Sequence, residues 1–518
     1  MSTDKSIHRQ IMKSSAVVSC GILSSRLLGF IRDIIFAGLL GTGFKGEAFF
    51  VAWRIPNMFR DLIGEGAANS AVIPVLSEHK QKEAKEDFWR LVNVVLVLFF
   101  IGLSAVTVLG IAFSGQIVKM LAPGFIADPG KLSLAADLTV VLFPYLILIG
   151  LAAYLGAVLI SFRSFSAASF SPCLLNISII VSAVAARFIK TEPVYVLSLG
   201  ILIGGILQLL ALLPDLYKKG FRLQIPLSLA HSGAKKIGRL LAPRLIGTSV
   251  YQLNVFVDTL CASLFFWVGP GGVSALYYSN RIVQLPLGVF STSLAAAILP
   301  TLSDLHIKDD KKSFQNALIF SVENMIFLML PITLIIMFTA YPLIRVLFER
   351  GEFNRYSTYI TGSALSFYVI GLFAFSANRL IASAFHSMQD TKTPVKIAAW
   401  SLALNTVLVF IFMWPFKIAG ISLASAISSI FNFHMLLREF DRRHGETGTA
   451  IRKFLFKNLI AVLVCGSVVF LLLKAVTIKN DIWYIIFCGT SVLILYFIIS
   501  LSLKIEQANT IKRFLKLP

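Results

Sequence analysis

The sequence has few charged residues, and acidic residues are the scarcest of them. Charged side chains make up 14% of its 518 positions, and 26 acidic residues stand against 47 lysines and arginines. Soluble proteins carry about 25% charged residues, so the shortage excludes an ordinary soluble domain. Hydrophobic residues reach 57%, and backbone groups in lipid are satisfied only in helices or closed barrels. The apolar runs described below predict an all-α polytopic membrane protein.

Groups suited to catalysis and metal binding are also few. The five cysteines show no CxxC spacing, and five of the seven histidines fall in predicted loops or in the tail. The other two approach span ends without a cysteine or an acid at ligand spacing. No GxxxxGK[ST] motif occurs, which argues against a nucleotide-driven pump. We therefore expect no enzymatic activity, no disulfide frame and no cofactor.

Fourteen apolar stretches are long enough to cross the hydrocarbon core as helices. They lie near residues 14–38, 47–68, 91–117, 133–160, 166–187, 193–217, 241–267, 273–302, 314–340, 357–386, 393–414, 418–437, 455–474 and 482–503. Lysine and arginine gather on the side of the N-terminus, so the positive-inside rule places both termini in the cytoplasm. This bias accounts for most of the net charge of +21. We expect the basic loops to contact anionic lipid rather than nucleic acid.

Two parts of the chain repeat each other. The matching segments are Arg54 with Arg281, the Pro-x-Leu-Ser-acid motif ending at Glu78 with that ending at Asp304, and residues 162–165 with residues 385–388. Corresponding spans lie six apart, an even number, so the copies insert as a parallel repeat with a substrate site between them. The expected parts are an N-lobe of six helices at 1–220, a basic cytoplasmic linker at 221–240, a C-lobe of six helices at 241–440, and two further helices with a basic tail at 441–518.

Charged residues stand within or against the first two spans, where a bilayer should exclude them. They are Arg26, Arg32, Asp33, Arg54, Arg60, Asp61 and Glu65. Such residues usually face a wet cavity, and guanidinium binds phosphate or carboxylate in a bidentate way. The set predicts an anion-binding cavity, with Arg281 added by the repeat. Buried ion pairs that fix helix packing, or arginines that reach the interface, are the alternative.

Helical spacing predicts which of these charges meet. At about 100° per residue, Arg26 and Asp33 share one face of their helix, with Arg32 to the side. Arg54, Asp61 and Glu65 share a face in the same way. We expect the opposed charges on each face to pair while the site is empty.

Proline and glycine interrupt the second and eighth spans. The residues are Pro56, Gly64, Gly66, Pro286 and Gly288. Proline removes a backbone hydrogen bond and bends a helix, and irregular backbone cannot face lipid. These breaks are expected to line the cavity or to act as hinges, and a packing kink is the alternative.

The first two spans also carry distinctive motifs. They read SRLLGFIRD at residues 25–33 and EAFFVAWRIPN at residues 47–57, followed by the Pro-x-Leu-Ser-Glu motif that ends at Glu78. This set resembles the MurJ (MviN) family of lipid II flippases, in the superfamily that includes the MATE transporters. The resemblance implies a V-shaped pair of lobes, a cationic central cavity and a groove by the last two helices for a polyprenyl tail.

The resemblance also implies roles for single residues. The family's essential arginines fall on Arg26, Arg32, Arg60 and Arg281, and its cavity serine falls on Ser274. Two acidic positions differ, because Glu47 and Asn280 stand where the family often has aspartate. Asn280 removes the charge, which puts in doubt any mechanism in which that acid pairs with Arg281 or carries a proton.

Some relatives bind sodium through residues that Asp258 and Asn405 resemble. Oxygen ligands would suit Na⁺, and a lone buried aspartate held by a hydrogen bond is the alternative.

Three classes of function compete. The arginines and the two additional spans favour a flippase for a lipid-linked diphosphate glycan. A MATE-type antiporter of cations would require a cavity dominated by carboxylates. An enzyme would require a set of acid, base or metal-binding residues. We expect a monomer that flips lipid II across the cytoplasmic membrane by alternating access. Another polyprenyl-diphosphate glycan is the alternative substrate. The driving force stays open among membrane potential, Na⁺ and H⁺.

Overall fold

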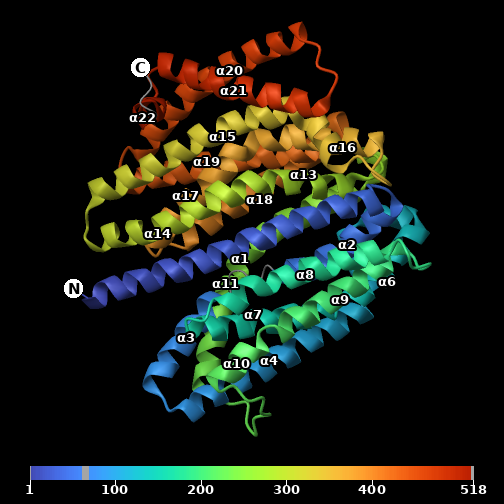
Figure 1. The fold of residues 1–518 in the computed structure, drawn as a ribbon, viewed down its shortest axis with the longest axis vertical. Helices are drawn as coiled ribbons and strands as arrows, with labels where there is room; N and C mark the ends of the chain where they lie inside the picture. The colour runs from blue at the N-terminus through green and yellow to red at the C-terminus, as the bar shows by residue number, and fades with distance from the viewer. Residues whose placement is uncertain (1, 61–68, 515–518) are drawn as a thin grey trace. The chain divides into compact units, whose positions relative to one another are not determined.

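The computed structural model describes residues 2–60 and 69–514. Within these ranges every regular element is a helix, and no strand occurs (Figure 1). Eleven helical segments in the described chain are long and apolar enough to cross a membrane. The other three predicted spans fall on the helices α1, α2 and α11. The prediction of an all-α polytopic membrane protein is confirmed.

Two compact units divide the chain between Ser263 and Leu264. The helix α11 ends at this boundary and packs against α3, α4 and α5 of the first unit. The contacts therefore group α11 with the first unit, although the sequence analysis began the second lobe at residue 241. Each unit is described by itself below.

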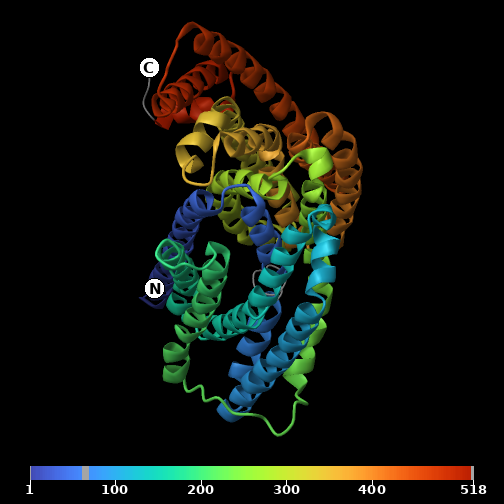
Figure 2. The same cartoon turned by 90° about the vertical axis from the view of Figure 1, so that its right-hand side faces the viewer.

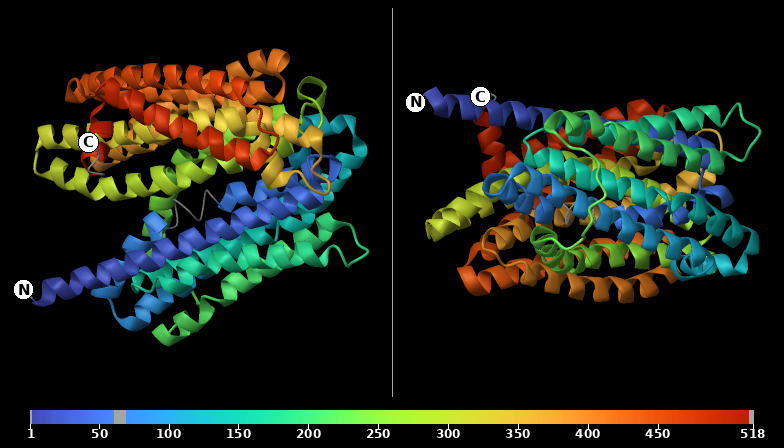
Figure 3. Two further views of the ribbon diagram at one scale, coloured as in Figure 1. Left: turned by 45° about the horizontal axis from the view of Figure 1, so that its top comes forward. Right: turned by 90° about the horizontal axis from the view of Figure 1, so that it is seen from below.

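The first unit is built from helices that run side by side. Its elements are α1 (Ser2–Leu40), α2 (Phe44–Arg60), α3 (Asn69–Lys82), α4 (Lys85–Ala112), α5 (Ser114–Leu121), the 3₁₀ turn η2 (Pro123–Ala127), α6 (Pro129–Leu142), α7 (Tyr145–Ser161), α8 (Ser166–Ala185), α9 (Pro193–Leu210), α10 (Leu213–Lys219) and α11 (Ser232–Ser263). Helix α1 lies along α8, and α8 lies along α9 (Figures 1 and 3). Side chains of α3, α4, α7 and α10 form an apolar core that includes Leu76, Phe88 and Tyr154.

The second unit is built from helices in the same way. Its elements are α12 (Phe265–Val268), α13 (Gly272–Pro286), the π-helical segment η3 (Leu287–Ser291), α14 (Thr292–Ile307), α15 (Lys311–Phe348), α16 (Arg355–Tyr368), the 3₁₀ turn η4 (Val369–Gly371), α17 (Leu372–Ser387), α18 (Lys392–Phe416), α19 (Ile418–His444), α20 (Thr447–Ala475), α21 (Asp481–Ser502) and α22 (Glu506–Phe514). Helices α20 and α21, the two that lie outside the predicted repeat, pack on α15 through a core that includes Cys465 and Tyr496.

The two units share backbone turns at matching positions. Arg163 follows α7 with φ of 57°, and Gln389 follows α17 with φ of 61°, 226 positions further on. In each turn an amide donates to a carbonyl five residues earlier, from Ser164 to Leu159 and from Asp390 to Phe385. Glu78 and Asp304 are also 226 positions apart. The turns therefore match Leu159 with Phe385, an offset of 226 positions. The sequence analysis paired residues 162–165 with 385–388, an offset of 223, so that alignment was wrong by three positions.

The breaks predicted in the second and eighth spans differ in form. Pro56 is buried inside α2, which continues to Arg60, whereas Gly64 and Gly66 lie outside the described residues. Pro286 ends α13, and the π-helical segment that contains Gly288 follows it directly. Such π segments are frequent at functional sites. The irregular helix after Pro286 is consistent with a hinge there, and the hinge itself remains a prediction.

The reversal from α18 to α19 depends on a glycine and generates a prediction. A methyl group at Gly420 would collide with the Phe412 carbonyl oxygen, whereas Gly489 in α21 has open space around it. Gly420→Ala should lower the thermal unfolding midpoint of the purified chain, at an overpacking cost of about 1–3 kcal/mol. Gly489→Ala should leave the midpoint unchanged or raise it, because alanine favours a helix interior. Equal midpoints for the two variants would contradict this packing.

Candidate functional site

Arg32 and Asp33 form a buried ion pair that ties α1 to α8. Their exposed fractions are 7% and 2%. Arg32 donates from Nη2 to Asp33 Oδ1 at 2.8 Å and from Nη1 to Asn176 Oδ1 of α8 at 2.9 Å. The Asn176 amide donates in turn to the Ser25 carbonyl at 3.1 Å. These contacts fix the packing of α1 on α8. For Arg32 and Asp33 they agree with the alternative given in the sequence analysis, that buried ion pairs fix helix packing.

The helical spacing predicted that Asp33 pairs with Arg26. In the structure Asp33 pairs instead with its neighbour Arg32. Arg26 and Asp33 lie seven positions apart, which is about 10.5 Å along the helix axis. The guanidinium of the adjacent Arg32 reaches the Asp33 carboxylate directly. Arg26 itself is exposed on α1. The two arginines of one helix thus have different surroundings.

Glu47 forms a second buried ion pair, with a partner that the sequence analysis did not single out. Its Oε2 lies 2.7 Å from Lys131 Nζ, and the two side chains are 3% and 11% exposed. Glu47 stands in the first turn of α2, where its charge also complements the helix dipole. Lys131, on α6, lies over the rings of Phe44 and Phe125 as well. The pair joins α2 to α6.

Arg54 and Arg60 are half-buried on α2. Both take part in interactions within the structure. Trp53, next to Arg54, packs against Tyr145 of α7 with ring centroids 5.4 Å apart. Asp61 and Glu65, the acids expected to share a face with Arg54, lie outside the described residues.

In the second unit, Asn280 and Arg281 are held by tyrosines. The Asn280 amide donates to the Tyr368 hydroxyl of α16 at 2.9 Å. Arg281 donates to the Tyr277 hydroxyl at 3.1 Å, and its guanidinium carbon lies 4.7 Å from the centroid of that ring. A cation above an aromatic face is stabilised by the ring quadrupole. The neutral Asn280 thus has a hydrogen-bond partner in the Tyr368 hydroxyl, and this contact does not require an acidic residue at position 280.

Ser274 is fully buried at the start of α13, and its hydroxyl has no hydrogen-bond partner among the described residues. A buried hydroxyl without a partner costs free energy. The cavity role of Ser274 remains a prediction.

The possible sodium ligands fall in different units. Asp258 lies half-buried on α11 in the first unit, and Asn405 lies fully buried on α18 in the second. Asn405 Oδ1 accepts a hydrogen bond from Ser428 at 3.3 Å. A cation held by both residues remains a prediction.

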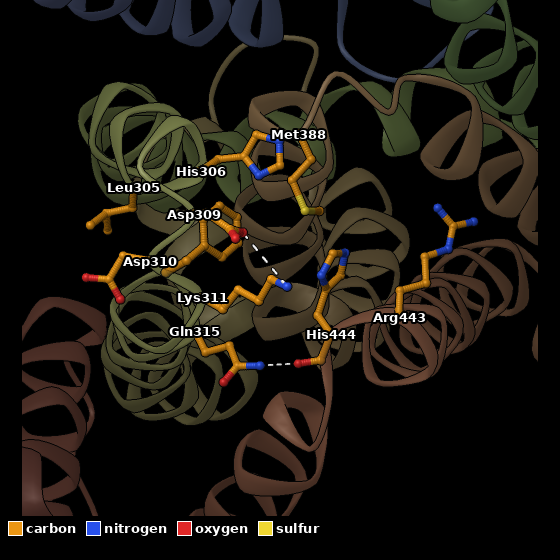
Figure 4. A pocket seen from close by; sticks show the side chains of 10 residues that line it. Leu305, His306, Asp309, Asp310, Lys311, Gln315, Met388, Arg443 and His444 are labelled. Atoms are coloured by element: carbon orange, nitrogen blue, oxygen red, sulfur yellow. Dashed lines mark hydrogen bonds and ion pairs between the residues drawn. The ribbon is translucent and has the colours of Figure 1, made fainter.

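A cavity of about 300 Å³ lies in the second unit, away from the predicted residues (Figure 4). It is lined by Leu305, His306, Asp309, Asp310, Lys311, Phe314, Gln315, Met388, Arg443 and His444. Arg443 at its rim pairs with Asp390 at 2.7 Å. Burial raises the pKa of Asp390, but hydrogen bonds from Thr393 and Arg443 outweigh it, so the pKa lies below its usual value. Lys311 also pairs with Asp309 in this cavity, at 3.8 Å.

Sequence reasoning missed four residues that hold the candidate site. They are Lys131, Asn176, Tyr277 and Tyr368. Tyr277 precedes Arg281 by four positions, a spacing at which helical side chains meet, so it could have been found. The other three come from distant helices and carry no local signal.

The fold is that of a multi-pass helical membrane protein. A MATE family multidrug transporter in an inward-facing conformation matches it with a TM-score of 0.71 at 16% identity, over 83% of this chain and 96% of that one. A family model described as lipid II flippase MurJ matches residues 36–505. The chain belongs to the MurJ family, as the motifs of its first two spans indicate.

Named relatives agree with this assignment. A protein of Vibrio cholerae described as a probable lipid II flippase MurJ is 34% identical over 439 residues, covering 83% of each chain. The lipid II flippase MurJ of Burkholderia cenocepacia is 31% identical over 437 residues, covering 84% of each. A solved structure of a lipid II flippase MurJ in an inward closed conformation matches with a TM-score of 0.79 at 25% identity, over 94% of this chain and 98% of that one.

The Arg32–Asp33 pair generates a prediction about stability. Arg32→Ala leaves the buried Asp33 carboxylate without its guanidinium, and breaking a buried pair costs about 3–5 kcal/mol. The thermal unfolding midpoint of the detergent-solubilised chain should fall, and the double variant Arg32→Ala/Asp33→Asn should recover part of the loss. Arg26→Ala is the matched control on the same helix and should cost less than about 0.5 kcal/mol. If the Arg32→Ala and Arg26→Ala variants have the same thermal unfolding midpoint, the Arg32–Asp33 ion pair does not hold α1 in place.

Proposed function

We propose that this chain flips lipid II, the undecaprenyl-diphosphate-linked disaccharide-pentapeptide, from the inner to the outer leaflet of the cytoplasmic membrane. The match of residues 36–505 to the lipid II flippase family carries the proposal. The arginines of α1, α2 and α13 support it, because a diphosphate is a ligand that several guanidinium groups bind well. The substrate needs no chemical change, and the proposal assigns no catalytic residue.

The cations divide into binding and positioning roles. Arg26, Arg54 and Arg281 would contact the diphosphate and the sugars. Arg32 would position α1 through Asp33 and Asn176, since an anion would have to displace both contacts to bind it. Arg60, Ser274 and Asn280 would complete the polar lining, with Glu47 holding α2 through Lys131.

Alternating access would move the head group across the membrane. The segment after Pro286 would bend in this step, and the polyprenyl tail would stay in lipid beside α20 and α21. With both termini in the cytoplasm, outward transfer of an anion gains about 2.3 kcal/mol per charge per 100 mV of inside-negative potential. Coupling to Na⁺ through Asp258 and Asn405, or coupling to H⁺, would be the other means of driving the cycle.

A depletion experiment tests the proposed substrate. A bacterium depleted of its own flippase should regain growth and outer-leaflet lipid II when it expresses this chain. Arg26→Ala and Arg281→Ala should each lower flipping at least about tenfold, since one charged hydrogen bond is worth about 1.5–3 kcal/mol. Arg187→Ala, an exposed arginine in the turn after α8, is the matched control and should rescue fully.

The outcomes separate the alternatives. Failure of the wild-type chain to rescue, despite normal membrane levels, would favour another polyprenyl-diphosphate glycan as substrate. Full rescue by both arginine variants would overturn the assignment of these residues to the diphosphate.

A further inference from the structure

Two histidines and an aspartate meet at one corner of the first unit, outside the residues considered so far. His79 lies near the end of α3, Asp87 in the first turn of α4, and His231 directly before α11. Nε2 of His79 lies 3.2 Å from Asp87 Oδ2, and Nε2 of His231 lies 3.4 Å from the same oxygen. The two imidazole rings are 5.3 Å apart between centroids. His79 and His231 stand 152 positions apart, so only the fold brings them together.

We propose that His79, Asp87 and His231 form a binding site for a divalent transition metal of the zinc type. One ligand atom from each residue lies within 4.8 Å of the others. Zinc bonds to nitrogen and oxygen at about 2.0–2.2 Å, which puts tetrahedral ligands about 3.3–3.6 Å apart. The two distances to Asp87 Oδ2 nearly match that spacing, so a metal could enter with small side-chain shifts.

The ligand types select the metal. Imidazole nitrogen suits zinc, cobalt and nickel, whereas Mg²⁺ and Ca²⁺ take mainly oxygen ligands. Three protein ligands leave a fourth tetrahedral position for water. The site is reached from the side of Asp87, whose side chain is 38% exposed against 15% for His79 and 6% for His231.

Binding would change two existing hydrogen bonds, the one between His79 Nε2 and Asp87 Oδ2 at 3.2 Å and the one that His231 accepts from Gly233. Nδ1 of His231 accepts from the Gly233 amide at 3.1 Å, so the neutral ring carries its proton on Nε2, the atom that lies 3.4 Å from Asp87 Oδ2. A metal on Nε2 moves that proton to Nδ1, and the contact with Gly233 is lost. At His231, one metal–nitrogen bond thus replaces one backbone hydrogen bond, and at His79 a metal–nitrogen bond replaces the hydrogen bond to Asp87.

The nearby charges moderate the affinity. Glu78 is paired with Lys82 at 3.1 Å and with Lys236 at 2.6 Å, so this adjacent carboxylate is already neutralised. The surrounding lysines repel a cation, and we expect weaker binding than at structural zinc sites with four ligands.

The position of the site gives the metal a structural effect. Residues 221–231 form an extended connection between α10 and α11 (Figure 2). Asn93 holds its first part, by accepting from the Gln224 amide at 3.0 Å and donating to the Arg222 carbonyl at 3.1 Å. A metal on His231 would hold its last residue to α3 and α4. Both ends of the connection would then be fixed to the first unit.

Cobalt titration of the purified full-length chain, without a polyhistidine tag, tests the proposal. One Co²⁺ per chain should give the visible absorption of a four-coordinate site, and Zn²⁺ should displace it. His79→Ala, His231→Ala and Asp87→Asn should each weaken binding at least about tenfold, because even outer-shell partners of metal ligands contribute that much. His434→Ala, an exposed histidine on α19, should bind as the wild type does.

A second measurement needs no variant. Carbethoxylation of His79 and His231 by diethylpyrocarbonate, followed by mass spectrometry, should slow when Zn²⁺ is present, while His434 keeps its rate. Absence of stoichiometric Co²⁺ binding by the wild-type chain, or equal binding by the His79→Ala/His231→Ala variant, would overturn the proposal and leave a hydrogen-bonded cluster only. Unchanged labelling of both histidines would do the same.

Discussion

A charge inside the membrane needs a partner, and this constraint decides how the helices of the first unit pack. The hydrocarbon core offers neither water nor ions, so a charge must meet another charge or a polar group within the protein. Arg32 meets Asp33 and Asn176, and Glu47 meets Lys131. The first group ties α1 to α8 and the second ties α2 to α6. The position of the candidate arginines on α1 and α2 therefore depends on these two ion pairs.

Two buried tyrosine hydroxyls, one in each unit, meet the same constraint by donating to a polar group of a neighbouring helix. The Tyr154 hydroxyl donates to the Val92 carbonyl at 2.9 Å, and the Tyr496 hydroxyl donates to Asn458 Oδ1 at 2.8 Å. Tyr496 belongs to α21 and Asn458 to α20, so this bond links the two helices that lie outside the repeat. A hydrogen bond between buried groups adds little net stability but is costly to lose, and it makes the packing of α20 on α21 specific.

The sequence predicts the fold much better than it predicts the contacts of the site. Hydropathy alone identifies membrane-spanning helices, because the thickness of the bilayer sets their length. Charged residues in apolar runs also pointed to α1 and α2, where the structure places the buried ion pairs of Arg32 and Glu47. Their partners could not be predicted, because Asn176 is 144 positions from Arg32 and Lys131 is 84 positions from Glu47. The same holds for His79 and His231, which the sequence placed in separate loops.

The contrast between Arg26 and Arg32 bears on which cations can bind an anion. An anion that approaches Arg32 must replace a carboxylate and an amide that already saturate much of the guanidinium, and a buried charge left behind costs about 3–5 kcal/mol. Arg26 is exposed, so an anion reaches its guanidinium without breaking a buried pair. Two arginines six residues apart on one helix thus have different surroundings, and we expect their substitutions to act in different ways. Arg32 contributes to holding α1 on α8, and the exposed Arg26 is the arginine of α1 that the proposed function assigns to the diphosphate.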